Sequence, residues 1–553
     1  MKQEFLSKKN FEDLDLGFVF DRLQVVTPYG ESAKKSLRPL GASALKELEH
    51  SFDLTERIME RLENKRHDVL ELKSTFKEIK QLANTFDRIE AGDTLSVTEL
   101  FEIKHLVMNM AKVKAMMEKL SWEKTVGDFL LHSAEPAMAL LDPENSGVGT
   151  FYIYSTYSKD LEDIRSALLE TETEIKRQTR AIALQIETEG FKVNANGEVR
   201  IQQIDRDNIE RAKQHPHLSY RMDIPLYSLF RIKPDPKYQE WHDQLLIEEE
   251  EAEYKVRIWL TAQLKKYLKM LRANCAHIGQ VDLLIAKGQF ALAFQCVRPK
   301  FVSESEGDGD GNLSIIGGRH LKVAYSLDRV GKSFTPVDID IHKTVTLITG
   351  ANMGGKTVSL RMIGQVIAMA HYGFFVPCKQ ATLYPLDFLF ISVGDSQSID
   401  MGLSTFGAEI VEIGQVIRRF SDRGLILIDE LARGTNPKEG YAISKALIEH
   451  LQTGSSKTLI TTHYDGLTQG PNLSHYQVNG LKDIDFEDIR TELKEKGIGL
   501  LHEYMDYRLT EVSGDKEIPK EALRISEMMG LAQTIIERAK EILGGSHDEQ
   551  IKS

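Results

Sequence analysis

Cysteine, net positive charge and long apolar runs are all scarce in this sequence of 553 residues. The three cysteines, Cys275, Cys296 and Cys378, include no C-x-x-C pair, which argues against a disulfide framework or zinc cluster and fits a reducing compartment. The net charge of −13 does not favour a general nucleic-acid binder, although a local basic strip would suffice for binding. The longest apolar segment, residues 366–376, is too short to span a bilayer, and the first residues do not resemble a targeting signal. We therefore expect a cytoplasmic protein with no membrane partner.

Proline is absent between Pro39 and Pro136, and this absence permits long helices. Apolar residues recur at intervals of three and four over residues 42–119, and a second helical run covers residues 159–188. Short strand-like segments and prolines follow between residues 190 and 241, and helical periodicity resumes over residues 245–276. We expect a helical core over residues 1–120, lever helices over 121–190, a small mixed tip over 191–244, and returning lever and core helices over 245–302.

Glycine and aspartate dominate residues 303–312, which we interpret as a linker between domains. Beyond it, short β-rich runs alternate with helical ones, a pattern typical of an α/β sheet. We expect an α/β nucleotide-binding domain over residues 303–470 and a helical segment over residues 471–553. The chain is long enough for several cores, so the predicted fold is multidomain, mainly α-helical in its first half and α/β in its second.

A strand over residues 346–349 leads directly into a G-x-x-x-x-G-K-T loop, and a helical segment follows it. This context indicates a P-loop, in which backbone N–H groups and the helix N-terminus hold phosphates. Lys356 can reach the β- and γ-phosphate oxygens of ATP, and the Thr357 hydroxyl can ligate Mg²⁺. The predicted nucleotide-binding residues in this segment are Gly350, Ala351, Asn352, Met353, Gly354, Gly355, Lys356, Thr357 and Val358.

Two further strands end in polar residues that suit ATP hydrolysis. Residues 424–428 form an apolar strand that ends in Asp429 and Glu430, where Asp429 can hold Mg²⁺ and Glu430 can polarise the attacking water. A third strand, residues 458–462, ends at His463, which can sense the γ-phosphate or position the water. A histidine after a strand is more often structural, but the ends of parallel strands converge on one sheet edge, which favours a functional role.

Taken together, these segments resemble the MutS family rather than P-loop ATPases in general. The Asn-Met-Gly-Gly-Lys sequence in the loop is distinctive, and further matching segments are 375–377, 404–406, 429–436 and 461–464. Alone, residues 402–409 would only indicate a helix start, but in the family comparison Ser404 belongs to a nucleotide-contacting signature. The resemblance also implies that Phe334 stacks on adenine, although core packing is an equal alternative.

The resemblance implies a dimer with two composite ATP sites of the ABC and MutS type. Ser404 of one subunit would approach the γ-phosphate held by Lys356 of the other, with residues 471–553 serving dimerisation. The tip would act as a clamp. The mismatch-reading domain of some relatives is not expected here, because the helical core begins almost at once and Phe76-Lys77-Glu78 matches the mismatch wedge only within a helical stretch. An appended nuclease domain is not expected either, because the sequence ends soon after the ATPase segment.

The leading hypothesis is therefore a MutS-like ATP hydrolase that forms an ATP-gated clamp on DNA and recognises DNA structure rather than mismatches. The alternative is an ATP-driven remodelling or reactivating factor that acts on a protein client, because the predicted tip mixes basic and acidic residues. Intact Lys356, Asp429 and Glu430 disfavour a purely regulatory nucleotide binder. The sequence leaves open a homodimer or a heterodimer with a paralogue, the ligand between the levers, the pathway and the turnover rate.

Overall fold

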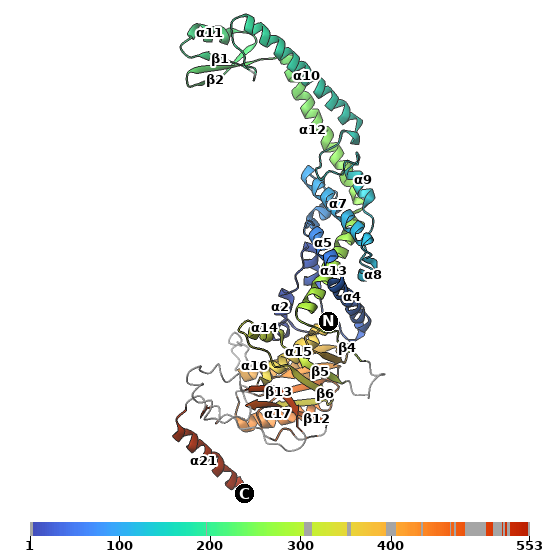
Figure 1. Ribbon diagram of the computed structural model, residues 1–553, viewed down its shortest axis with the longest axis vertical. Helices are drawn as coiled ribbons and strands as arrows, with labels where there is room; N and C mark the ends of the chain where they lie inside the picture. The colour runs from blue at the N-terminus through green and yellow to red at the C-terminus, as the bar shows by residue number, and fades with distance from the viewer. Residues whose placement is uncertain are drawn as a thin grey trace. The chain divides into compact units, whose positions relative to one another are not determined.

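The computed structural model divides into two units, which we describe separately (Figure 1). The sheet unit comprises Met1–Ser74, Leu120–Phe129 and Ile278–Ser553, and the helical unit comprises Thr75–Lys119 and Leu130–His277. The structure describes residues 4–194, 196–302, 312–350, 355–393, 405–432, 435–464, 466–468, 470, 472–481, 505–512, 523, 526–527 and 531–550.

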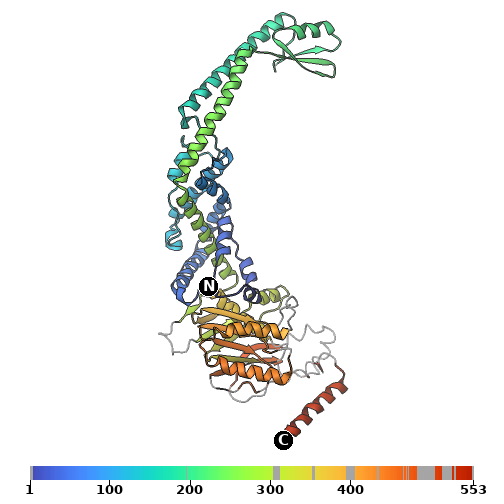
Figure 2. The ribbon, with the colours of Figure 1, turned by 180° about the vertical axis from the view of Figure 1, so that it is seen from behind.

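Two 30-residue helices dominate the helical unit, α10 (Lys159–Thr188) and α12 (Pro236–Lys265). They lie side by side in both views (Figure 1, Figure 2) and run in opposite directions. Arg165 joins them, because its guanidinium lies 2.7 Å from Glu249 and 2.6 Å from Glu253. The predicted run at residues 159–188 coincides with α10, whereas α12 begins nine residues before the predicted start. Pro236 lies in the first turn of α12 and does not break the helix. Backbone N–H groups in the first turn have no acceptor within the helix, so the N–H that proline lacks is not needed there.

A three-stranded antiparallel sheet in the order β1-β3-β2 follows α10 in the chain. Its strands are β1 (Glu198–Gln202), β2 (Leu218–Ile224) and β3 (Tyr227–Ile232), with α11 (Arg206–Gln214) between β1 and β2. Its small core includes Phe191, Val199 and Phe230. The remaining elements of the helical unit are α6 (Ala83–Ala91), α7 (Val97–Lys119), α9 (Glu135–Leu141) and η2 (Ser155–Tyr157), and α13 (Leu268–Ala293) begins here and continues into the sheet unit.

The first helices of the chain pack within the sheet unit. They are α1 (Lys8–Asp13), α2 (Leu16–Asp21), α3 (Pro28–Ser36), η1 (Ala42–Ala44), α4 (Leu45–Asn64), α5 (Arg66–Phe76), which runs two residues past this unit, and the later α8 (Glu123–Val126). Asp282 of α13 anchors the start of α3, since its Oδ2 accepts hydrogen bonds from Val26 N, Thr27 N and Thr27 Oγ1 at 2.7–2.9 Å. This segment therefore belongs to the core that supports the sheet.

The main sheet has six strands in the order β13-β12-β7-β11-β10-β9. Its strands are β7 (Val345–Thr349), β9 (Phe388–Ser392), β10 (Gly424–Ile428), β11 (Lys457–Thr461), β12 (Leu473–Leu481) and β13 (Met505–Glu511), and only β13 is antiparallel to its neighbour. Along β10, Leu425 and Leu427 join one core and Ile426 and Ile428 join the other. Both faces are therefore covered, by α15 (Lys356–His371) on one side and by α16 (Thr405–Ile417) and α17 (Pro437–Leu451) on the other (Figure 2).

A smaller sheet in the order β4-β8-β5-β6 completes the unit. Its strands are β4 (Lys300–Phe301), β5 (Leu313–Gly318), β6 (Val337–Ile341) and β8 (Gln380–Leu383), with α14 (Leu321–Asp328) between β5 and β6. The chain thus combines a large helical amino-terminal part with an α/β carboxyl-terminal region, as the sequence predicts. None of the helices in the described ranges is long and apolar enough to cross a membrane.

The predicted helical segment over residues 471–553 needs correction. Its first described part forms β12 and β13, and only α21 (Gln533–Gln550) is a long helix there. Along β12, Tyr476 and Val478 alternate with polar residues and pack in the core that also contains residues of α15. Alternation of this kind buries one face of a strand, which explains why this segment is a strand rather than the predicted helix.

Candidate functional site

The candidate site lies where three neighbouring parallel strands end. β7, β11 and β10 are adjacent in the sheet, so the residues that follow them share one edge. Gly350 follows β7, Asp429 follows β10, and His463 lies two residues beyond β11. The sheet therefore brings together the ends of the three predicted motifs.

The helix after the P-loop begins at the predicted phosphate-binding lysine. Gly355 caps α15 with a φ of 84°, a left-handed conformation that favours glycine, and Lys356 is the first helical residue. The Lys356 amine is buried and donates a hydrogen bond to Gly350 O over 2.6 Å. Burial lowers the pKa of Lys356, while the nearby Glu430 and Asp429 carboxylates oppose that shift. Val358 follows Thr357 in the first turn and is half-buried.

Asp429, the residue after β10, connects the P-loop helix α15 to the neighbouring strand β11. Its Oδ2 accepts a hydrogen bond from Thr357 Oγ1 over 2.7 Å, and its Oδ1 accepts one from Thr461 Oγ1 over 2.6 Å. The same Thr461 hydroxyl oxygen accepts a hydrogen bond from Glu430 N over 2.8 Å. Thr357, Asp429, Thr461 and Glu430 therefore form one continuous hydrogen-bonded set.

The donor chemistry of this set fits Mg²⁺. Thr357 and Asp429 present a hydroxyl and a carboxylate within hydrogen-bond distance of each other, and Mg²⁺ prefers such oxygen ligands. Among the described residues, no group of three or more His, Cys, Asp and Glu side chains could enclose a metal by itself.

Glu430 lies in a tightly wound turn after β10. Its φ is +50°, and that of Ala432 is +61°, so two non-glycine residues adopt the left-handed conformation around buried Leu431. Such backbone persists only where surrounding contacts hold it. His463 is exposed at the end of β11, with its ring 4.7 Å from that of Tyr464.

Several predicted residues cannot be placed at the site. Ala351, Asn352, Met353, Gly354 and Ser404 lie outside the described residues. Phe334 is half-buried just before β6, and its stacking on adenine stays a prediction.

Sequence reasoning assigned no role to two polar residues beside the P-loop strand. Thr461 links Asp429 to Glu430, as described above, although its position at the end of a strand gave a usable signal. His475 of β12 lies beside β7, and its Nε2 is 2.7 Å from the hydroxyl of Thr349. Burial lowers the pKa of His475, so the neutral imidazole is favoured.

Tyr507 of β13 is a third residue that sequence reasoning missed. A Cβ atom at Gly355 would lie 2.9 Å from Tyr507 Cδ1, which places this aromatic ring directly against Gly355, the residue before α15. The contact also explains why only glycine fits at residue 355, in addition to its positive φ.

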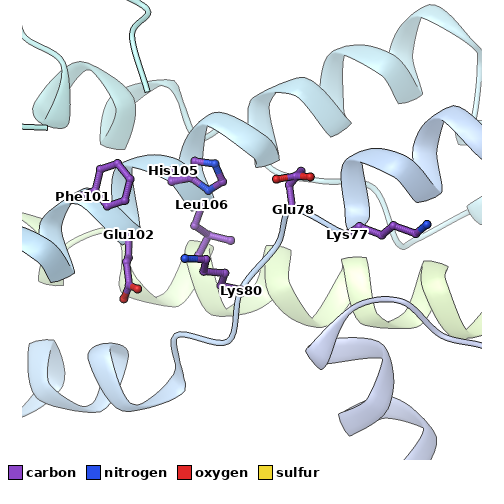
Figure 3. A pocket seen from close by; sticks show the side chains of 7 residues that line it. All are labelled: Lys77, Glu78, Lys80, Phe101, Glu102, His105 and Leu106. Atoms are coloured by element: carbon purple, nitrogen blue, oxygen red, sulfur yellow. The ribbon is translucent and has the colours of Figure 1, made fainter. Parts of the chain in front are cut away.

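The helical unit contains a separate pocket of about 290 Å³ (Figure 3). Its lining carries charges of both signs and one imidazole, from Lys77, Glu78, Lys80, Phe101, Glu102, His105 and Leu106. The balance of charges selects no class of ligand, and the pocket includes none of the predicted site residues.

The candidate site lies in a segment that matches a known protein domain. The model of MutS domain V matches residues 346–545, which include the three strand ends. The chain is 33% identical over 301 residues to the endonuclease MutS2 of Clostridium tetani, covering 54% of this chain and 34% of that protein. It is 30% identical over 317 residues to the DNA mismatch repair protein MutS of Oceanobacillus iheyensis (56% and 34%), and 27% identical over 493 residues to that of Halothermothrix orenii (86% and 51%).

The chain thus spans between a third and about half the length of these relatives. The match to the Halothermothrix protein covers most of this chain and extends well beyond the sheet that carries the P-loop. Residues 346–545 therefore match MutS domain V, and at the level of the family the chain is similar to the MutS and MutS2 proteins.

Proposed function

We propose that this chain is a Mg²⁺-dependent ATPase of the MutS type that forms a dimeric, ATP-gated clamp on DNA. The observation that carries the proposal is the continuous hydrogen-bonded set of Thr357, Asp429, Thr461 and Glu430 beside buried Lys356. It joins the start of a phosphate-binding helix to an acidic pair at one sheet edge, and P-loop hydrolases require both.

Each residue has a distinct role in this proposal. The N-terminus of α15 and Lys356 bind the β- and γ-phosphates, for which the Lys356 amine exchanges its hydrogen bond to Gly350 O for phosphate oxygens. Thr357 and Asp429 would hold Mg²⁺, which neutralises charge on the phosphates when bound. Glu430 polarises the attacking water and accepts its proton, and His463 contacts the γ-phosphate or that water.

An aromatic side chain can stack on the nucleotide base, and two of the described residues are candidates for this contact. Tyr507 already lies against the P-loop at Gly355, and Phe334 is the candidate that the family resemblance provides. We propose that the base packs against at least one of these rings, because stacking gives affinity without demanding a precise hydrogen-bond geometry.

The names of the relatives support a DNA ligand, whereas the dimer follows from the family resemblance of the sequence motifs. Two of the relatives are DNA mismatch repair proteins by name. In the proposed dimer, Ser404 of the partner subunit approaches the nucleotide at Lys356, and the paired helices α10 and α12 carry the small sheet as a clamp.

One observation keeps the protein-remodelling alternative in view. Two basic side chains of the small sheet and of α11 are paired with acids: Arg221 lies 3.1 Å from Glu198, and Lys213 lies 3.1 Å from Glu210. Paired cations neutralise fewer phosphates than free ones, so these residues give only weak support for tight DNA binding.

The proposal is tested by steady-state ATPase assays with and without duplex, branched and single-stranded DNA at two salt concentrations. A rate that changes with DNA structure, together with salt-dependent binding, supports the clamp on DNA. ATP hydrolysis that no DNA alters, without DNA binding, favours the protein client. Absence of Mg²⁺-dependent hydrolysis contradicts both.

A further inference from the structure

The turn that carries Glu430 is held by side chains from two different elements. Thr461 of β11 accepts the hydrogen bond of Glu430 N over 2.8 Å. On the other side of Leu431, Oε1 of Glu409 accepts the hydrogen bond of Ala432 N over 3.2 Å. Glu409 belongs to α16, so this helix and a neighbouring strand together fix the left-handed turn.

Apolar packing connects the same helix to the same turn. Leu431 is 3% exposed and shares a core with Ile413 and Val416 of α16. Because the two residues that flank Leu431 both have positive φ, a shift of α16 would change the contacts that hold them in this conformation.

The environment of Glu409 favours a role in holding the backbone of the turn over a role as the partner of a cation. Burial raises the pKa of its carboxyl to about 7, and the hydrogen bond from Ala432 opposes that shift. The neighbouring Glu412 also raises it, but Glu412 is itself paired with Lys9 of α1. Glu409 thus accepts a backbone hydrogen bond at a desolvated position, whereas Glu412 on the same helix forms an ordinary ion pair.

We propose that Glu409 is a positioning residue for Glu430, because it holds the Ala432 N–H and so fixes the turn that directs the Glu430 side chain. The inference rests on the proposed function, in which Glu430 polarises water. It connects α16 to the turn that carries Glu430 through a single hydrogen bond.

The test compares Glu409→Ala and Glu409→Gln with the matched control Glu412→Ala, which removes a carboxylate from the same helix. We would measure kcat and KM for ATP, and the Kd of a fluorescent ATP analogue. Glu409→Ala should lower kcat by about 10- to 100-fold with KM and Kd within about twofold, because misplacement of a catalytic group affects turnover rather than ground-state binding. Glu409→Gln keeps an acceptor oxygen and should stay within about threefold of the wild type, as should Glu412→Ala.

An unchanged kcat in Glu409→Ala would overturn the inference, as would equal losses in the alanine and glutamine variants or a parallel rise in Kd. If Glu409→Ala does not fold, Glu409→Asp decides instead: the shorter side chain should lower kcat without changing Kd, and a normal kcat overturns the inference. Glu430→Gln is assayed alongside. Full turnover in that variant refutes the proposed role of Glu430 itself, whereas normal turnover in Glu409→Ala with an inactive Glu430→Gln refutes only the positioning role.

Discussion

The hydroxyl of Thr357 donates a 2.7 Å hydrogen bond to Oδ2 of Asp429, a residue 72 positions further along the chain. This contact joins the start of α15 to the end of β10 within the folded chain. The two oxygen donors proposed for Mg²⁺ are therefore already close together in the folded chain, which reduces the reorganisation that metal binding requires.

Thr357→Ala removes one of these donors. We expect the Mg²⁺ concentration for half-maximal ATPase activity to rise about tenfold or more, since the site loses an oxygen ligand. Thr357→Ser keeps the hydroxyl and serves as the control, with an expected change of less than about threefold. A Mg²⁺ titration of ATPase activity measures both, and an unchanged titration in the alanine variant contradicts the assignment.

Thr461→Val keeps the side-chain shape but removes the hydroxyl that bridges Asp429 and Glu430. It leaves the Glu430 N–H without this acceptor, so we expect a loss of about 1–3 kcal/mol in unfolding free energy. Turnover should also fall by about tenfold or more, because both acids lose a positioning contact. Urea unfolding and steady-state kinetics test this. Thr461→Ser should retain most of the wild-type stability and rate, and similar losses in both variants would assign the effect to packing rather than to the hydroxyl.

Lys287 of α13 predicts a pH dependence of stability. Its buried amine donates hydrogen bonds to Tyr372 O and Gly373 O at the C-terminal end of α15, and burial lowers its pKa to about 8. The unfolded chain keeps an ordinary lysine pKa of about 10.4, so between about pH 8 and 10 the unfolded state binds more protons. Stability from this group therefore rises with pH across that window.

Between about pH 8 and 10, the unfolding free energy of the wild type should rise by about 2 kcal/mol more than that of Lys287→Met. Urea unfolding of both proteins at several pH values gives this difference. The control is Lys8→Met, which removes a lysine whose side chain is 92% exposed and should follow the wild-type pH profile. Parallel profiles for wild type and Lys287→Met would show that Lys287 has an ordinary pKa.

The sequence predicted those parts of the site that local chain order determines. The P-loop, the Asp429-Glu430 pair and the strand before His463 each combine an apolar strand with a polar end, and the parallel sheet then brings these ends to one edge. The long helix α10 was equally predictable, because its periodicity continues without proline.

Other contacts depend on tertiary packing that no local pattern contains. Tyr507 lies against Gly355 because β12 and β13 extend the main sheet. The sequence analysis predicted a helical segment over residues 471–553 and therefore did not predict these two strands. The bond between Glu409 and Ala432 likewise joins a helix to a turn with no shared motif. The proposed role of α16 in positioning Glu430 therefore depends on its contact with the left-handed turn, which the sequence does not predict.

The most direct test of the account is the ATPase rate of Glu430→Gln, measured beside its nucleotide affinity. The substitution keeps the size of the side chain but removes the carboxylate that we propose accepts a proton from water. We predict that Mg²⁺–ATP binds within about threefold of the wild-type affinity while turnover falls by about 100-fold or more. Turnover near the wild-type rate would contradict the central claim, because another group would then have to activate the water.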